Sequence, residues 1–309
     1  MRRSYIKLAG IQASNEALWQ YAKEKNLKER MMFIKRVLSF ALFFAIMLSC
    51  LSLTALAVES RSSVGVYING ERFWGGVNVK DYTTFVAIRK FSTSMYSDAS
   101  VKYDYSTRTL TVKTDKLTMT ATDGQNYIVA NGRYLYTESP VYMRSGVMYA
   151  PVLLLAKAFD AKISWDDGTS SFYLTRGSGG ILSGDKFYRE DEVYWLSRII
   201  YAESGAEPIK GKIAVGNVIL NRTRHSYFPN TIYGVIFDKK NGTQFSPTAN
   251  GTIYKTPNAQ SVAAAKICLE GYSVSRDILY FVNASLVPNS WVVKNRPLYA
   301  KIGNHSFYY

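Results

Sequence analysis

A glutamate at the end of a predicted helix is the residue of this sequence that best fits acid–base chemistry. Three apolar residues precede Glu203 at helical spacing, so its carboxyl ends an apolar stripe that faces the interior. They are Leu196, Ile199 and Ile200, and Gly205 just beyond is a helix stop signal. Burial raises a carboxyl pKa toward neutrality, which a general acid working near pH 7 requires. The alternative from this pattern alone is a partly exposed glutamate at the end of a surface helix.

Two further helices and a strand are predicted around Glu203. Pro208 can open a second helix that runs to Leu220 and is apolar nearly all round, so we expect it to be buried. A third helix is framed by Thr256 and Pro257 at its start and by Gly271 at its end. The run 278–282 is strand-like, and the alternation over 305–309 predicts another strand.

Residues 66–176 contain an internal repeat with a spacing of about 62 residues. The first copy holds the segments YING (67–70), FVAI (85–88), VKYD (101–104) and TLTV (109–112), which return as VANG (129–132), MYAP (148–151), KISWD (162–166) and SFYL (171–174). Each copy predicts short alternating strands, an Asn-Gly turn and one short helical piece, near 87–96 or 151–159. We expect the two copies to bury their apolar faces against each other.

The ends of these regions suggest how the chain is divided. Lys35 and Arg36 precede an apolar run over 37–53, and a small-x-small site at 55–57 follows, so residues 1–57 predict an N-terminal extension and a secretory signal peptide. A retained membrane anchor is the alternative. Residues 177–180, GSGG, predict a flexible linker before a C-terminal domain over 181–309.

Composition places the chain among basic globular proteins. Of its 309 residues 47% are hydrophobic and 20% are charged, and the net charge is +15. Loss of residues 1–57 would remove nine Lys/Arg and three Asp/Glu and leave about +9, which favours polyanionic partners such as wall polymers. No nucleic-acid motif is present. Cleavage would also leave Cys268 as a lone thiol, which excludes an internal disulfide.

The repeated block resembles the copper amine oxidase N-terminal-like, or stalk, domain. The resemblance rests on the Asn-Gly starts, the segments VAIR (86–89) and APVLL (150–154), and an aromatic-Asp pair before a threonine-rich strand. The second copy lacks the arginine of the first. The block has no His and no Cys, so no copper is implied. The resemblance implies a spacer or a wall-binding part without catalysis.

The C-terminal domain resembles the SleB-type cell wall hydrolases. The matching segments occur in order and are IIYAESGAEPIKGKIAVGNVILNR (199–222), FP and VI (228–236), QFSPTANG (244–251), AAAKICLEGY (263–272), LYFVN (279–283) and IGNHSFYY (302–309). The family is similar in fold to lysozyme-like lytic transglycosylases. The resemblance therefore implies an α+β protein, with a mainly helical catalytic domain and a small β part joined to the duplicated β-rich stalk.

The resemblance implies that Glu203 is the catalytic residue and that the substrate is peptidoglycan. A lytic transglycosylase needs one carboxyl, whereas ordinary glycosidases use two. Glu207 is four residues on; it either faces the same cleft or caps the second helix. The other candidates for substrate binding have structural alternatives as turn, core or strand residues: Gln244, Phe245, Tyr280, Asn283, Trp291 and His305.

Other chemistries fit the sequence less well. The chain has two histidines, His225 and His305, too far apart in sequence for a close-spaced zinc motif, so we expect no metal and no cofactor. Cys268 lies late in an Ala-rich helix, where a small buried residue is the expected role. The hypothesis is an exported enzyme of the cell envelope or spore wall that cuts peptidoglycan. The alternatives are a non-catalytic wall-binding protein and a water-using muramidase.

Overall fold

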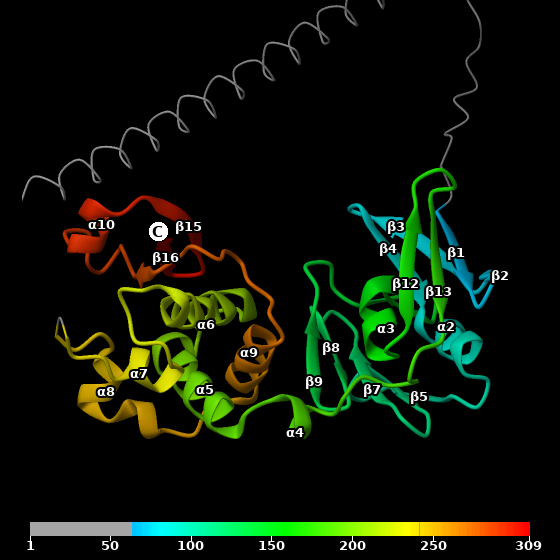
Figure 1. The fold of residues 1–309 in the computed structure, drawn as a ribbon, viewed down its shortest axis with the longest axis horizontal. Helices are drawn as coiled ribbons and strands as arrows, with labels where there is room; N and C mark the ends of the chain where they lie inside the picture. The colour runs from blue at the N-terminus through cyan, green and yellow to red at the C-terminus, as the bar shows by residue number, and fades with distance from the viewer. Residues whose placement is uncertain (1–63, 241) are drawn as a thin grey trace, which may run out of the picture. The chain divides into compact units, whose positions relative to one another are not determined.

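The computed structural model describes residues 64–240 and 242–309 (Figure 1). The predicted signal peptide, over residues 1–57, lies outside the described residues. Within the described ranges, no helix has the length and apolar character needed to cross a membrane. A β-rich region comes first along the chain and a mainly helical region follows, so the predicted α+β class is confirmed.

The β-rich region contains short strands and two short helices. The strands are β1 (Gly65–Ile68), β2 (Glu71–Arg72), β3 (Val77–Lys80), β4 (Thr83–Ala87), β5 (Ser100–Asp104), β6 (Thr109–Lys113), β7 (Thr118–Thr122), β8 (Tyr127–Ala130), β9 (Arg133–Tyr136), β10 (Tyr142–Arg144), β11 (Val147–Pro151), β12 (Lys162–Asp166) and β13 (Ser171–Thr175). The helices are α2 (Ile88–Met95) and α3 (Val152–Ala158). Each helix follows the strand that the repeat pattern placed before it.

The two repeat copies are interlocked. The strand orders are β12-β13-β1-β2, β10-β11-β4-β3 and β5-β6-β7-β8-β9. The equivalent strands β4 and β11 pair with each other, and β1 of the first copy pairs in parallel with β13 of the second. Residues of both copies therefore share one buried core, which includes Phe91, Leu155 and Phe159.

Both predicted Asn-Gly turns have the backbone that their sequence requires. The φ angles are 53° at Asn69 and 87° at Gly70, and 48° at Asn131 and 80° at Gly132. Two successive residues with positive φ suit a tight hairpin turn, and Asn and Gly tolerate this conformation best. The turns join β1 to β2 and β8 to β9.

The second region is built around three helices and a small sheet. Its elements are α4 (Gly184–Phe187), α5 (Glu190–Ser204), α6 (Ile209–Arg224), α7 (Ile232–Ile236), α8 (Ser246–Asn250), the 3-10 helix η1 (Thr252–Tyr254), α9 (Ala259–Leu269), β14 (Tyr280–Val282), α10 (Trp291–Asn295), β15 (Leu298–Ile302) and β16 (His305–Tyr308). The sheet order is β14-β16-β15. Helices α5, α6 and α9 pack against one another and hold Glu203 at the end of α5.

Helix α6 is buried on all sides from Gly211 to Arg222, as its apolar sequence predicted. A Cβ at Gly216 would lie 2.7 Å from the sulfur of Cys268 on α9, so glycine permits the close approach of the two helices. Cys268 is buried, and burial raises the pKa of its thiol far above the ordinary value. This agrees with the structural role expected for it.

One local expectation is wrong. Asn258, not Thr256 or Pro257, caps α9, because its side chain accepts a hydrogen bond from the backbone N of Ser261. Residues 177–180, predicted to be a linker, lie against the β-rich region. A Cβ at Gly177 would lie 1.8 Å from the carbonyl oxygen of Asp160, so this glycine permits backbone contact.

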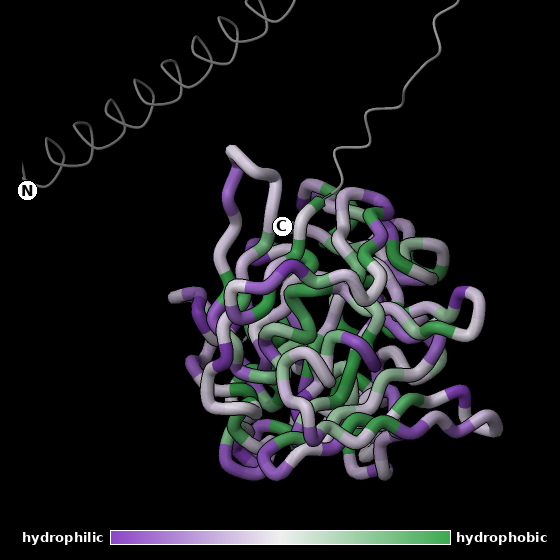
Figure 2. The backbone as a smooth tube through the Cα atoms, turned by 90° about the vertical axis from the view of Figure 1, so that its right-hand side faces the viewer, coloured by the Kyte–Doolittle hydropathy of each residue, from purple (hydrophilic) through white to green (hydrophobic). Residues whose placement is uncertain are grey.

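Hydrophobic segments gather in the interior of the described chain and hydrophilic ones in its outer loops (Figure 2). The second region has its own buried core, centred on α5, α6 and α9. Three tyrosines of the β-rich region, Tyr127, Tyr134 and Tyr136, pack against this core.

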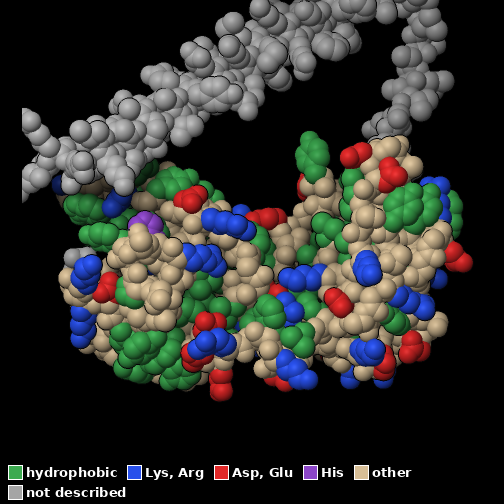
Figure 3. Space-filling view, viewed as in Figure 1, with side chains coloured by type: hydrophobic (Ala, Val, Ile, Leu, Met, Phe, Trp, Pro, Cys, Tyr) green, Lys and Arg blue, Asp and Glu red, His purple; other side chains and the backbone are tan. Residues whose placement is uncertain are grey.

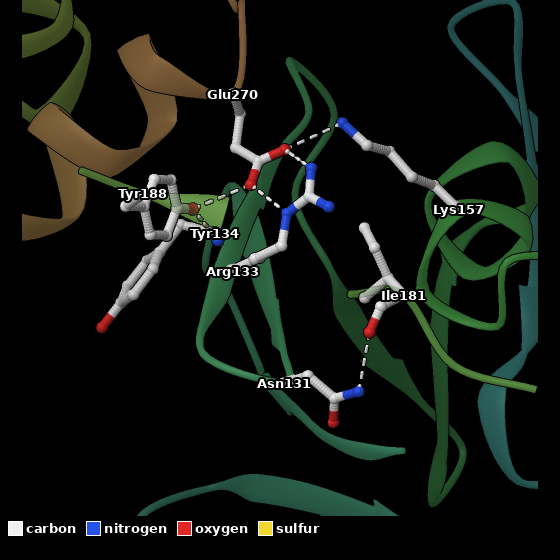
Figure 4. A network of polar contacts seen from close by, with 7 residues as sticks. All are labelled: Asn131, Arg133, Tyr134, Lys157, Ile181, Tyr188 and Glu270. Atoms are coloured by element: carbon white, nitrogen blue, oxygen red, sulfur yellow. Dashed lines mark hydrogen bonds and ion pairs between the residues drawn. The ribbon is translucent and has the colours of Figure 1, made fainter. Parts of the chain in front are cut away.

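A buried carboxylate at the end of α9 contacts the β-rich region (Figure 4). Arg133 donates two hydrogen bonds to Glu270, each 2.7 Å long. Lys157 and the hydroxyl of Tyr188 donate to the same carboxylate at 3.0 and 2.8 Å. Burial opposes the charged form, but these donors outweigh it and hold the pKa of Glu270 below its ordinary value. The carboxylate is therefore fully paired despite its burial.

Candidate active site

Glu203 lies at the penultimate position of α5, partly buried. The three apolar residues that precede it, Leu196, Ile199 and Ile200, are fully buried, as the helical pattern predicted. Burial is the cause that raises the pKa of the Glu203 carboxyl from 4.5 to about 7. An acid with this pKa can both donate and accept a proton near neutral pH.

Two grooves meet at Glu203. We call them the aromatic groove, of about 960 Å³, and the polar groove, of about 730 Å³. Glu203 and Ser246 line both of them, so the carboxyl has open space on two sides. An extended chain molecule can therefore cross the site with units on each side of the carboxyl.

Rings and guanidinium groups line the aromatic groove. Tyr280 is half-buried and Trp291 is exposed, and their ring centroids are 6.2 Å apart. The guanidinium of Arg296 lies 4.8 Å from the Tyr280 ring and 5.0 Å from the Trp291 ring. Gln244 also lines this groove, and its Oε1 accepts a 3.4 Å hydrogen bond from Arg222. The structure thus brings Gln244, Tyr280 and Trp291 together.

Glu207 lines the polar groove, but both of its carboxylate oxygens are engaged. The backbone N and the Nδ2 of Asn304 donate to them at 2.9 Å each. Burial would raise the pKa of Glu207, yet these bonds outweigh it and the pKa is lowered. Glu207 and Glu203 are the carboxylates among the described residues that line the two grooves. Only Glu203 is free of such engagement.

Three other residues that the sequence offered for substrate binding make contacts typical of core, turn or packing residues. Phe245 lines the aromatic groove but is 4% exposed and belongs to the core. The Oδ1 of Asn283 accepts a bond from the backbone N of Ser285, which is a turn contact. His305 packs edge-on against Phe281, and burial lowers its pKa. Asn283 and His305 line neither groove of the described chain.

Three residues of the site were not predicted from the sequence. Ser246 lies between the two grooves, and Arg222 and Arg296 line the aromatic one. Arg222 carried a signal that could have been used, because it is a charged residue in a helix whose apolar pattern predicts burial, although the buried Lys212 of the same helix carries that signal too. Ser246 begins α8 and Arg296 follows the end of α10, and the sequences of these short helices show no comparable pattern.

The described residues contain no group of three or more His, Cys, Asp or Glu side chains that could hold a metal ion. Hydrogen-bonding, aromatic and acidic side chains surround Glu203 instead. The arrangement can bind a polar chain molecule and transfer a proton to it.

Two family models match the chain, and both resemblances inferred from the sequence are confirmed. Residues 206–308 match the family described as Cell Wall Hydrolase, and residues 68–174 match the Copper amine oxidase N-terminal domain. The first match begins three residues beyond Glu203 and so does not include it.

The chain is also similar to spore cortex-lytic enzymes. That of Bacillus cereus is 36% identical over 120 residues, which are 39% of this chain and 45% of that protein. The enzyme of Bacillus subtilis (strain 168) is 32% identical over 120 residues and 38% of its length is covered. The chain therefore spans less than half the length of these curated relatives.

Among solved structures, the catalytic domain of the germination-specific lytic transglycosylase SleB from Bacillus anthracis is 35% identical. The match covers 40% of this chain and 97% of that domain, with a TM-score of 0.36. The catalytic domain of the Bacillus cereus SleB protein is also 35% identical, with 92% of it covered and the same TM-score.

Proposed function

The C-terminal region of this chain belongs to the Cell Wall Hydrolase family, and we propose on that premise that the protein is an exported enzyme that cleaves peptidoglycan. The observation that carries the proposal is the free carboxyl of Glu203, with a pKa raised to about 7, at the junction of two grooves. A glycan strand would cross this junction. The bond to be cut joins N-acetylmuramic acid to N-acetylglucosamine.

In the proposed reaction Glu203 acts as acid and then as base. Its protonated carboxyl gives its proton to the bridging oxygen as the bond from the muramyl C1 to that oxygen breaks. The resulting carboxylate accepts the proton of the muramyl 6-hydroxyl, whose oxygen bonds to C1. An internal ether forms, no water is consumed, and the carboxyl is protonated again. The engagement of Glu207 by Asn304 supports a route that uses one carboxyl.

We assign sugar binding to the aromatic groove. Tyr280 and Trp291 offer ring surface to pyranose rings, and Gln244 offers an amide to N-acetyl groups. Phe245, Asn283 and His305 are assigned structural roles because of the contacts described above. Glu207 is assigned the role of holding the turn at Asn304.

The names of the relatives favour spore cortex peptidoglycan as the substrate. Export would depend on the signal peptide predicted in residues 1–57. The β-rich stalk would act as a spacer or bind anionic wall polymers. Figure 3 shows Lys and Arg side chains scattered over both regions on the face in view. This scatter does not support a localised binding site for anionic polymers on that face.

The experiment that tests the proposal compares fragment release from purified spore cortex and vegetative walls. The wild-type protein should release soluble glycan, and Glu203→Gln should bind the walls but release none. Glu190→Gln, an exposed change on the same helix, should behave as wild type. Equal release by Glu203→Gln would refute the assignment. No release by the wild type from either wall would favour the non-catalytic wall-binding alternative.

The masses of the released fragments separate the two enzymatic routes. The ether-forming route gives products lighter by one water than those of a muramidase. A reducing muramic acid end would contradict the transglycosylase mechanism while leaving glycan cleavage intact.

A further inference from the structure

Arg222 is a buried cation at the wall of the aromatic groove. Only 6% of the residue is exposed. Its guanidinium lies 4.7 Å from the ring of Phe228, 5.3 Å from that of Phe245 and 5.4 Å from that of Tyr280. Burial lowers its pKa to about 10, which still leaves it charged at neutral pH.

The guanidinium has no carboxylate partner among the described residues. No acidic oxygen forms an ion pair with it within 4.0 Å, although the charge of Asp238 acts on it from farther away and offsets part of the effect of burial on its pKa. Its Nε donates to the carbonyl of Leu279 at 2.8 Å and its Nη1 donates to Gln244 at 3.4 Å. A buried charge without a counter-ion in direct contact is costly, so a carboxylate that reaches the guanidinium is favoured when one is supplied.

The remaining nitrogen of Arg222 is open to the groove. Its Nη2 makes no hydrogen bond within the described chain. A fully buried nitrogen without a partner would stand out as unsatisfied, and Nη2 is not one of the atoms in that state. It therefore retains access to solvent, and the open space beside Arg222 is the aromatic groove. A planar guanidinium with a free donor is well suited to bind a carboxylate.

Arg296 adds a second positive charge to the groove. Arg296 lies over the Tyr280 ring, donates to its hydroxyl at 3.1 Å and forms no ion pair with a carboxylate of the described residues. Glu203 is the acidic residue of this groove, and its raised pKa keeps much of it neutral near pH 7. The groove therefore carries a positive charge that Asp238 offsets only from a distance and that a neutral sugar chain would leave without a direct partner.

We propose that Arg222 binds a carboxylate of the substrate, so that the aromatic groove selects acidic muramyl units over neutral ones. This inference rests on the proposed function for the identity of the glycan. The carboxylate has two possible sources, the lactyl group of a muramic acid without a peptide and the peptide stem of a substituted one. Arg222 would act as a specificity residue, and Glu203 would remain the acid.

A structural role for Arg222 predicts a different result. Its bond to Leu279 and its contacts with three rings would then hold β14 against α6, whatever the charge of the ligand. The two roles separate when ligand charge is varied on one unchanged protein. Binding to Glu203→Gln is the suitable readout, because it does not depend on cleavage.

The experiment measures the dissociation constants of four soluble glycans for Glu203→Gln in the full chain. Two carry peptide stems, and two are stripped of peptides so that the lactyl carboxylates are free. Within each pair, one glycan has free carboxylates and the other has them converted to methyl amides. We expect the acidic form of at least one pair to bind about tenfold more tightly or better, and the pair that shows the preference identifies the source.

Variants of Arg222 in the Glu203→Gln background complete the test. Arg222→Met should abolish the preference, Arg222→Lys should keep part of it, and Arg224→Met, an exposed change on the same helix, should keep it in full. Equal binding of acidic and amidated glycans in both pairs would overturn the proposal, and this result needs no Arg222 variant to fold. A preference that persists in Arg222→Met would also overturn it. Cleavage by the wild type, measured separately, reports on the proposed function alone.

Discussion

At the scale of single residues, the burial of Glu203 lowers the stability of the folded protein but favours the proposed chemistry. Burial raises its pKa from 4.5 to about 7, so the folded protein retains a proton that the unfolded chain releases between these values. The stability of the wild type must therefore fall as pH rises across this window. The proposed reaction needs a protonated carboxyl, and burial provides it at the cost of this loss of stability.

Glu203→Gln should stabilise the protein at pH 8 by up to about 3 kcal/mol, since the amide is not ionised on folding or unfolding. At pH 4 the gain should vanish, because the carboxyl is then protonated in both states. Urea denaturation at the two pH values measures the difference. Glu190→Gln serves as the control, and a gain for Glu203→Gln that is the same at pH 4 and pH 8 would contradict the raised pKa.

Single residues of the site could be predicted only where a local pattern reported their surroundings. The helical spacing of Leu196, Ile199 and Ile200 indicated the burial of Glu203. The surroundings of Phe245 and Arg222 depend on β14, which is more than thirty residues away along the chain. Pattern alone could not distinguish a ring that faces a groove from one that fills the core.

At the scale of elements, Glu207 joins the start of α6 to the turn between β15 and β16. Its carboxylate accepts two hydrogen bonds from Asn304. The neighbouring Gly303 has a φ of 61°, and a Cβ there would lie 1.8 Å from Glu207 Oε2. The turn thus closes directly on this carboxylate, which holds the small sheet against the helices.

Glu207→Ala should lower the free energy of unfolding by about 1–3 kcal/mol at pH 7, because two hydrogen bonds from Asn304 to a buried, charged carboxylate are lost. The pKa of Glu207 is lowered in the folded state, so its contribution is present above the ordinary value and declines as pH falls below it. Urea denaturation at pH 7 and pH 4 checks both statements. Glu71→Ala, an exposed change in β2, should have little effect, and an equally small effect of Glu207→Ala would contradict the account.

Helices were the most predictable elements. The apolar sequence of α6 and the glycine after α9 are local signals, and they placed both helices within a few residues of their bounds. The cap of α9 was missed because Thr256, Pro257 and Asn258 are all acceptable helix-start residues. The choice among them depends on which side chain reaches the backbone N of Ser261.

At the scale of the whole described molecule, the two regions are joined by the buried carboxylate of Glu270. Its side chain is 3% exposed, and that of Arg133 is 9% exposed. Loss of the carboxylate would leave Arg133 buried without a counter-ion, which costs about 3–5 kcal/mol. A second pair, Lys210 and Glu138, links the same two regions but is 46% and 56% exposed.

Glu270→Gln should therefore lower the free energy of unfolding by about 3 kcal/mol. Lys210→Met, which breaks the exposed pair, should change it by less than about 1 kcal/mol. Urea denaturation of the full chain provides both values. Similar effects of the two substitutions would show that burial does not make the Glu270 network contribute more to stability than the exposed pair.

The contact between the regions was not predictable from the sequence. Arg133 and Glu270 are 137 residues apart, and no local pattern links them. The glycines of 177–180 indicated a flexible segment, yet the same lack of side chains allows the close packing seen at Gly177. Composition alone does not distinguish these two uses of glycine.

The most direct test of the account is the titration of the Glu203 carboxyl by carbon NMR in the full chain, with Glu203→Gln used to assign its signal. A midpoint of about 7 is predicted, because burial is the cause acting on this group. A midpoint near the ordinary value of 4.5 would mean that the carboxyl is ionised at neutral pH and cannot serve as the proton donor, and it would contradict the central claim.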